Sequence, residues 1–270
     1  MSQPGFLSSV SELATLVPSG SQLAIGKNQT GVPCELVRAL VRRKVTDLHV
    51  VGVPTGGYAI DLLIGAGCVA AVESSAVTLD ETGSAPRFIN AIKTGRIRMI
   101  DSTCPAVYAG LSAGEKGIPF IPIRGLIGSD IEQRREDYQI VDNPFQAKDP
   151  IVVVPAITPD FALLHAPMAD DHGNVYFGTD RDLELMAHAA KSALVTVESR
   201  YEGNLMESQA HRAASLSSIY VGGVALAERG AWPLGLAGHY EEDLEHMREY
   251  RQQALTDAAF ADYVERHVAA

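Results

Sequence analysis

The sequence is poor in cysteine, in long apolar runs and in positive charge. Its three cysteines, Cys34, Cys68 and Cys104, are widely spaced and odd in number, which argues against a disulfide framework or a cysteine-based zinc site. No apolar run reaches the roughly 18–20 residues that cross a bilayer. The N-terminal stretch also lacks the basic region and apolar run of a signal peptide. We therefore expect a cytoplasmic protein without membrane contact.

The charge balance excludes a further class of partner. The chain carries 33 acidic and 22 basic residues, a net charge of -11. Broad contact with nucleic acid or an anionic membrane needs clustered cations, so neither is expected. One local cationic patch for an anionic substrate remains compatible with this balance.

The segment AIGKNQTGVP, residues 24–33, lacks the order of a nucleotide-binding loop. In a phosphate-binding loop the lysine follows the last glycine and opens the helix, whereas Lys27 directly follows the first glycine, Gly26. A dinucleotide-binding turn would need a third glycine, and Cys34 and Glu35 stand in its place. What remains is a strand, a flexible turn and a helix, with backbone amides directed at a negatively charged group.

Short β-rich runs alternate with helical stretches along the chain. The β-rich runs predict strands at residues 22–25, 47–53, 69–75, 119–123, 151–155, 161–166, 194–198 and 219–224. Several of them are apolar on both faces, which is typical of a parallel sheet covered by helices on each side. Helices are expected from Pro33 onward and at 86–95, 181–191, 241–254 and 257–268. The predicted fold class is α/β, an open, mostly parallel sheet with helices on both faces.

No repeat, charge block or low-complexity linker divides the chain. We expect one domain over residues 1–270, with C-terminal helices at about 240–268 packed on it. The polar stretch 124–150 could be a domain linker, but long loops in compact enzymes are more often binding loops.

Glycines cluster where the predicted strands end, which is where ligands bind in open α/β sheets. Any single glycine is better explained as closing a turn. Their repetition after successive strands makes a functional role about equally plausible. The residues in question are Gly26, Gly31, Gly52, Gly56, Gly57, Gly83, Gly125, Gly128 and Gly173.

Several segments together resemble family I coenzyme A-transferases, specifically the alpha (A) subunit of the glutaconate CoA-transferase branch. IGKNQTGVP matches the signature Gly-Gly-Phe-x-x-x-Gly-x-Pro through Gly26, Gly31 and Pro33, although Ile25 and Lys27 replace the first glycine and the phenylalanine. Further segments follow in the family's order from about residue 15 to the end: 51–73, 83–97, 117–131, 141–145, 159–177 and 230–243, the last with Trp232 in place of a usual histidine. The resemblance implies the fold that these transferases share with sugar-phosphate isomerases.

The resemblance also implies a mechanism and a partner. In this family a glutamate attacks the acyl-CoA thioester, and in two-subunit members it lies in the other subunit, within a Ser-Glu-Asn-Gly turn. This chain contains no such turn, and the equivalent positions Val53, Pro54 and Thr55 offer no carboxylate. We expect a non-nucleophilic subunit without a catalytic residue or permanent cofactor, which uses coenzyme A as substrate and pairs with a glutamate-bearing beta subunit.

The turns matched to the family give the expected pocket for substrate and CoA. A glycine turn there would direct fixed N–H dipoles at a thioester or acyl oxyanion. Lys27 could meet a substrate carboxylate or a CoA phosphate, or simply face solvent. The pocket residues are Gly26, Lys27, Gly31, Gly56, Gly57, Gly83, Pro86, Gly128 and Ser129.

Other reactive residues have simpler explanations. Glu73 is expected to be a solvated carboxylate at a strand end, Glu198 a structural hydrogen-bond acceptor, and Cys104 a small buried apolar residue. His165, Asp170 and His172 have no metal-ligand spacing. His165 is expected to hydrogen-bond within a buried strand, and Asp170 to cap a turn with Gly173 and Asn174. No metal site is expected.

Three functions are compatible with the sequence. The first is a CoA-transferase subunit. The second is a subunit of a ring-opening acyl-CoA hydrolase of the steroid-degradation type. The resemblance implies an acidic residue near position 104 in such subunits, whereas this chain has Cys104 there and Asp101 three residues before it, which disfavours this function. The third is a non-catalytic ligand-binding protein on the same fold, which the acidic charge and the lack of a helix-turn-helix extension disfavour.

Overall fold

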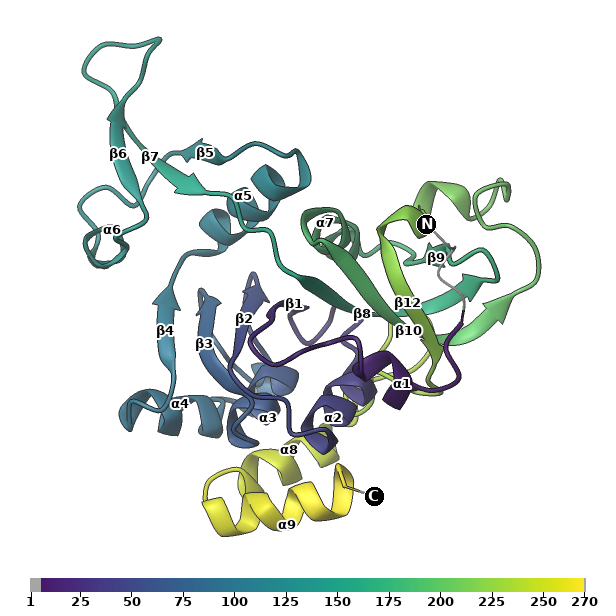
Figure 1. The fold of residues 1–270 in the computed structure, drawn as a ribbon. Coiled ribbons are helices and arrows are strands. Elements are labelled where there is room, and N and C mark those ends of the chain that lie inside the picture. The colour runs from purple at the N-terminus through teal and green to yellow at the C-terminus, as the bar shows by residue number, and fades with distance from the viewer. Residues whose placement is uncertain (1–5, 270) are drawn as a thin grey trace.

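Parallel strands form the centre of the molecule (Figure 1). The structure is a computed structural model that describes residues 6–269. Neighbouring parallel strands follow the spatial order β4, β3, β2, β1, β8, β10, β12, and the short strands β9 and β11 add antiparallel pairs beyond β8. These strands span β1 Gln22–Gly26, β2 Leu48–Val53, β3 Val69–Ser74, β4 Arg98–Asp101, β8 Phe161–Asp170, β9 Val175–Tyr176, β10 Ser192–Tyr201, β11 Ser215–Leu216 and β12 Val221–Leu226. The predicted α/β class with a mostly parallel sheet is confirmed.

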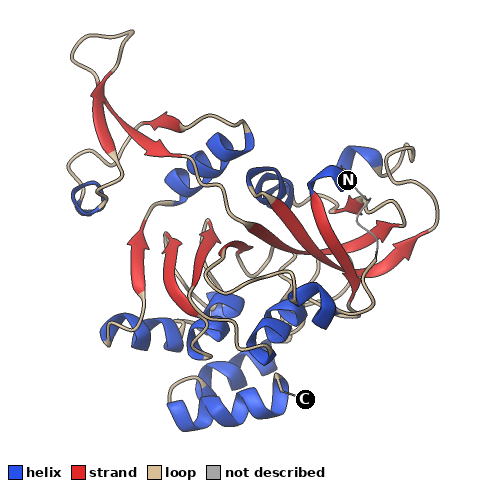
Figure 2. Cartoon of the chain, in the orientation of Figure 1, coloured by secondary structure: helices blue, strands red, loops and turns tan. Residues whose placement is uncertain are grey.

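Helices cover both faces of this sheet (Figure 2). Alternate side chains of the strands point to opposite faces; Leu23 and Ile25 belong to one core, and Ala24 between them belongs to the other. The first core lies under α2, α3, α4, α8 and α9, and the second under α5 and α7. The helices span α1 Val10–Ala14, α2 Cys34–Arg42, α3 Tyr58–Gly65, α4 Pro86–Lys93, α5 Cys104–Glu115, α6 Asp130–Arg134, α7 Arg181–Ala189, α8 Leu244–Gln253 and α9 Asp257–His267, with short 3-10 turns at Asp80–Thr82, Arg212–Ala214 and Ser218–Tyr220.

The helix after β1 shows why the chain folds this way locally. Its apolar stripe of Leu36, Val37, Leu40 and Val41 is buried against the sheet. Pro33 was predicted to be the first helical residue, but it stands at the N-cap and the helix begins one residue later, at Cys34. None of the described helices is long and apolar enough to cross a membrane.

The C-terminal helices contribute side chains to the first core. Met247 and Tyr250 of α8 and Phe260 and Tyr263 of α9 are buried in the same apolar cluster as α2 and α3. The buried carboxylate of Asp61 on α3 accepts hydrogen bonds from the Phe88 amide and the Tyr250 hydroxyl, each at 2.7 Å. Burial, only partly offset by these hydrogen bonds, raises the pKa of Asp61 to about 6.

Two predicted strands lie outside the main sheet, which corrects their expected placement. Residues 119–123 and 151–155 were expected to join the parallel sheet, but β5 Phe120–Ile123 and β7 Pro150–Pro155 pair antiparallel in a separate sheet. The stretch 124–150, expected to be a loop, contains α6 and the third strand, β6 Gln139–Asp142. We call residues 120–155 the small-sheet module; it projects from the end of α5 (Figure 1).

A buried ion pair attaches the small-sheet module to the main sheet. Arg135 Nη2 lies 2.9 Å from Oε1 of Glu73 on β3, and both side chains are less than a tenth exposed. The same guanidinium donates to the Asp101 carbonyl and to Asp137, and it lies 4.1 Å over the Tyr138 ring. The carboxylate of Glu73 is therefore not solvated, and that expectation is wrong.

Replacing Arg135 by Met should destabilise the protein by about 3–5 kcal/mol, because it leaves the Glu73 carboxylate buried without its cation. Denaturant unfolding would measure this loss, and limited proteolysis near residues 143–149 would report release of the module. Arg124→Met is the matched control, since Arg124 pairs with Asp149 in the same module but is 67% exposed; it should change little. Equal losses in both variants would contradict the attachment role.

Candidate active site

The loop after β1 is closed by a hydrogen bond inside the turn itself. The hydroxyl and the amide of Thr30 both donate to the Lys27 carbonyl, at 2.8 and 3.0 Å. A Cβ on Gly26 would lie 2.0 Å from the Thr30 hydroxyl oxygen, so only glycine permits this closure. The turn is thus a compact bend at the carboxyl end of β1, where ligands bind in open α/β sheets.

Asn28 joins this turn to the next one. Its buried side chain accepts a hydrogen bond from the Tyr58 amide at the start of α3, at 2.8 Å, and donates to Asp80 at 2.9 Å. A Cβ on Gly57 would lie 1.8 Å from the Asn28 carbonyl oxygen. Gly57 is therefore required for the close approach of the two turns, which places it beside the turn that contains Gly26 and Lys27. Contact of these three residues with substrate stays a prediction.

Gly31 packs the turn against β8. Its φ is +20°, and an added Cβ would lie 2.1 Å from the His165 carbonyl oxygen. Its own carbonyl accepts the His165 amide at 2.6 Å. Two amides of the turn are also used inside the fold, since Lys27 N–H donates to Val53 and Thr30 N–H to Lys27. Close backbone packing explains these glycines at least as fully as the presentation of amides to a ligand.

Lys27 supplies a partly exposed cation at this edge. Its Nζ lies 3.5 Å from Oδ2 of Asp182, at the start of α7, and its side chain is 40% exposed. Tyr108 of α5 donates to the same carboxylate oxygen at 3.0 Å, and burial together with this hydrogen bond raises the pKa of Tyr108. Burial and the neighbouring Asp182 also raise the pKa of Asp180. One lysine therefore lies beside two acids and faces open solvent.

Cys104 is exposed, which corrects the expectation of a buried residue. It is the first residue of α5, directly after the N-cap Thr103. Its Sγ lies 3.1 Å from the Ser75 hydroxyl, which also lies 2.9 Å from the Pro54 carbonyl oxygen. The thiol thus stands where the turns after β2, β3 and β4 meet, a placement that no local sequence signal indicated.

Glu198 is fully engaged in hydrogen bonds, as expected. It lies 2.8 Å from His165 Nε2 and accepts from the Tyr240 hydroxyl at 2.7 Å and from the amides of Arg229 and Gly230. Burial alone would raise its pKa, but the hydrogen bonds from His165, Tyr240 and Arg229 hold the pKa of Glu198 at about 2. It is a structural carboxylate.

His165 and Asp170 serve separate local networks. The ring of His165 contacts Thr196 and Glu198, each at 2.8 Å, inside the sheet. Asp170 accepts the amides of His172, Asn174 and Leu205, as the predicted turn requires. Among residues 6–269, the His165 ring and the Asp170 carboxylate have no hydrogen-bond partner in common.

The other predicted pocket residues lie at different distances from this edge. Gly56 belongs to the turn after β2, where its amide donates to Ala76 at 2.7 Å. Gly83 has a φ of +109° and faces Arg251 of α8, and Pro86 begins α4. Gly128 and Ser129 are in the small-sheet module, where Ser129 caps α6. Contact of these residues with substrate stays a prediction.

A cavity of about 220 Å³ opens beside the turn after β1, lined by Gln29, Gly31, His165, Asp180, Leu183 and His239 among others. A larger cavity of about 640 Å³ lies between α9 and the loops that precede β2 and β3. Ligands of open α/β sheets bind at the carboxyl ends of strands, so we assign the candidate site to the smaller cavity and the surface around Lys27 and Cys104.

Comparison with known proteins identifies relatives of this architecture. The coenzyme A transferase family model matches residues 7–216. The cholesterol ring-cleaving hydrolase IpdA subunit of Rhodococcus jostii is 32% identical over 91% of this chain and 86% of its own length. The A subunit of glutaconate CoA-transferase from Acidaminococcus fermentans is 28% identical over 92% of this chain and 82% of its own length.

Solved structures agree with these sequence matches. The crystal structure of the Acidaminococcus fermentans glutaconate coenzyme A-transferase superposes with a TM-score of 0.89 at 25% identity, covering 97% of this chain and 88% of that chain. A variant of the decarboxylase AibA/AibB superposes with a TM-score of 0.87 at 29% identity, covering 99% and 100%. Both likenesses extend over nearly the whole chain.

Glu198→Gln should lower the free energy of unfolding at neutral pH and lose this effect in acid. The pKa of Glu198 is lower in the folded protein, about 2, than its ordinary value of 4.5 in the unfolded chain. The ionised carboxylate therefore stabilises the fold fully above pH 4.5, and this stabilisation is lost as the pH falls toward about 2. Urea unfolding of both proteins from pH 7 to pH 2.5 would measure the difference. A difference that is constant with pH would contradict the role of the ionised carboxylate.

Proposed function

This chain belongs to the coenzyme A transferase family, and from that membership we propose that it is the non-nucleophilic subunit of a heteromeric CoA-transferase. The enzyme moves CoA between an acyl-CoA and a free acid, of dicarboxylic or oxo type. The catalytic glutamate comes from the partner subunit, in a Ser-Glu-Asn-Gly turn. Coenzyme A is a substrate, and no permanent cofactor is required.

The observation that carries this proposal is that the carboxylates around the site are already paired with other side chains. The turn after β2 has Pro54 and Thr55 and no acid. Glu73 is paired with Arg135, and Glu198 with His165. A nucleophilic carboxylate must be free to attack and to form an acyl intermediate, so these two glutamates do not suit the role.

The proposed contribution of this chain is a rigid frame and one cation. The close-packed turns of Gly26, Gly31 and Gly57 fix the carboxyl edge of β1 and β2, and Lys27 binds an anionic group of CoA or of the acid. In the reaction, the partner's glutamate attacks the thioester carbonyl and displaces the CoA thiolate, which then attacks the resulting anhydride. Attack on its glutamyl carbonyl releases the donor acid and leaves a glutamyl-CoA thioester, and attack of the acceptor carboxylate on that thioester starts the second half of the transfer.

Exposed apolar side chains support the presence of a partner subunit. Phe145 is 95% exposed at the tip between β6 and β7, and four more apolar residues of the small-sheet module are at least a third exposed: Phe120, Ile127, Ile140 and Val141. Large apolar patches left exposed on one part of a protein are typical of protein–protein contacts, and all five side chains belong to the small-sheet module. We assign this surface to the beta subunit.

A second candidate function rests on the 32% identity to the ring-cleaving hydrolase subunit. In that case water, rather than an acid, would receive the acyl group or open a ring. Cys104 stands where such relatives are expected to have an acidic residue, and this disfavours hydrolysis. With acyl-CoA and an acceptor acid present, a transferase yields a new thioester, whereas a hydrolase yields free CoA or a ring-opened product.

The purified chain alone should show no transfer of CoA from acyl-CoA to free carboxylates, because it lacks the nucleophile. Adding the beta subunit should restore turnover, and a beta subunit with its turn glutamate replaced by glutamine is the matched control. Borohydride or hydroxylamine, added after acyl-CoA, should trap a modified glutamate on the beta subunit only. Full turnover by the isolated chain, or label on Glu73, Glu198 or Cys104, would contradict the proposed division of roles.

Lys27→Ala should raise KM about tenfold or more with little change in kcat, since a hydrogen bond to a charged group contributes about 1.5–3 kcal/mol and loss of uniform binding appears in KM. Steady-state kinetics of the reconstituted complex would measure both constants. Lys191→Ala is the control, because Lys191 is also an exposed ion-paired lysine but contacts Asp160, which precedes β8 at the opposite sheet edge. Equal effects in the two variants would mean that Lys27 does not bind substrate.

A further inference from the structure

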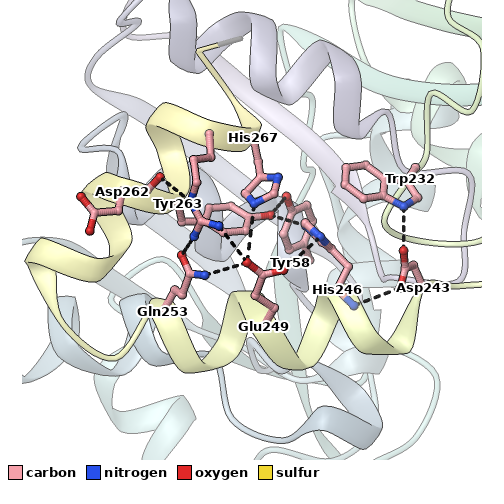
Figure 3. A network of polar contacts seen from close by, with 10 residues as sticks. Tyr58, Trp232, Asp243, His246, Glu249, Gln253, Asp262, Tyr263 and His267 are labelled. Carbon is pink, nitrogen blue, oxygen red and sulfur yellow. Dashed lines mark hydrogen bonds and ion pairs between the residues drawn. The ribbon is translucent and has the colours of Figure 1, made fainter.

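Two histidines and a glutamate converge between the two C-terminal helices. His246 and Glu249 lie one turn apart on α8, and His267 is the last residue of α9. Figure 3 shows the three side chains pointing toward one another across the helix pair. The charge pattern of the segment containing α8 is typical of solvated surface, but His246, Met247 and Tyr250 are buried.

The three side chains surround a common point without hydrogen-bonding to one another. Nδ1 of His246 lies 3.9 Å from Glu249 Oε2, and Nε2 of His267 lies 3.7 Å from Glu249 Oε1. One ligand atom from each residue lies within 4.8 Å of the other two. Nε2 of His267 is buried and makes no hydrogen bond among residues 6–269. A buried polar atom of this kind calls for a partner.

Outer contacts fix the orientation of each side chain. The other ring nitrogen of His246, Nε2, lies 2.7 Å from the Tyr263 hydroxyl, which is 2.9 Å from the Tyr58 hydroxyl. Gln253 donates to Glu249 Oε1 at 2.7 Å. Metal-binding histidines are usually held in this way through their second nitrogen. Burial, followed by the nearby His267, lowers the pKa of His246, which favours the neutral imidazole that a metal requires.

We propose that His246, Glu249 and His267 form a three-ligand site for a divalent transition-metal ion of the Zn²⁺ class. Two imidazoles and one carboxylate are a donor set that suits Zn²⁺ and argues against Mg²⁺ or Ca²⁺, which prefer oxygen ligands. Tetrahedral Zn²⁺ needs ligand atoms about 3.3 Å apart, so ligand atoms that now lie within 4.8 Å of one another would approach each other by up to about 1.5 Å on binding. The side chain of Glu249 is 38% exposed, so the cluster is open to solvent on the side of this residue.

A metal ion here would link α9 to α8. The rival explanation is a metal-free cluster in which Arg266, 3.2 Å from Glu249 Oε1, neutralises the carboxylate. The two explanations predict opposite effects of Arg266. In a metal site its guanidinium repels the incoming cation, whereas in a metal-free cluster it is the main stabilising partner.

The test measures Zn²⁺ binding to the full chain, purified without a histidine tag, by equilibrium dialysis and elemental analysis. We expect one Zn²⁺ per chain, and at least 100-fold weaker binding in His267→Gln and Glu249→Gln. His188→Gln is the matched control, since His188 also contacts a glutamate, Glu115 at 3.4 Å, on another part of the surface; it should bind like wild type. Co²⁺ should give the intense visible absorption of a tetrahedral site in wild type and in His188→Gln only.

Arg266→Gln completes the test, and it should tighten Zn²⁺ binding. At a Zn²⁺ concentration 100 times the wild-type Kd, the ratio of folded to unfolded protein should rise about 100-fold in wild type and at most about twofold in His267→Gln. The proposal is overturned if wild type binds no Zn²⁺ up to millimolar concentration. It is equally overturned if His267→Gln and Glu249→Gln bind like wild type, if His188→Gln binds as weakly as they do, or if Arg266→Gln weakens binding.

Discussion

The buried side-chain amide of Asn28 is the contact on which the candidate site depends. A buried amide must have its hydrogen bonds satisfied, and Asn28 satisfies its own with the Tyr58 amide and Asp80. These bonds draw the turn after β1 against the start of α3, and the approach leaves no space for a Cβ at Gly57. The hydroxyl of Tyr58 in turn lies 2.9 Å from the hydroxyl of Tyr263 on α9. Tyr58 therefore connects the turn after β1 to the C-terminal helices.

Much of the fold could be predicted from apolar patterns. Strands β1, β2, β3, β8 and β10 were located because both of their faces are buried, and α2 because its apolar residues recur at helical spacing. The same reasoning placed residues 119–123 and 151–155 in the wrong sheet, since composition shows that a run is β-forming but not which strands it pairs with. Strand β6 is exposed along its whole length, so it carries no apolar pattern to detect.

The site could be predicted only where a local rule applied. Glycines after strands marked the turns that pack closely in the structure, because such turns leave no space for a Cβ at Gly26, Gly31 or Gly57. The environment of Glu73 depends on Arg135, 62 residues away, and that of Lys27 on Asp182 in a distant helix. Such pairs arise from the packing of separate elements and leave no trace in local spacing. The exposure of Cys104 has the same origin, since it depends on where α5 begins relative to the turn that contains Ser75.

In the proposed division of roles, the distribution of charge within this chain is the reason that the covalent chemistry falls to a second subunit. Buried carboxylates must be paired or hydrogen-bonded, and the three described near the sheet are: Asp61 by Tyr250, Glu73 by Arg135, and Asp170 by the amides of its own turn and of Leu205. The half-buried Glu198 is held in the same way by His165. Such pairing holds a fold together, but it also makes a carboxylate a poor nucleophile, because its lone pairs already accept hydrogen bonds. In this proposal, the paired carboxylates hold the strands and turns in place and so fix the position of Lys27. The reacting carboxylate must be unpaired, and it therefore comes from the partner subunit.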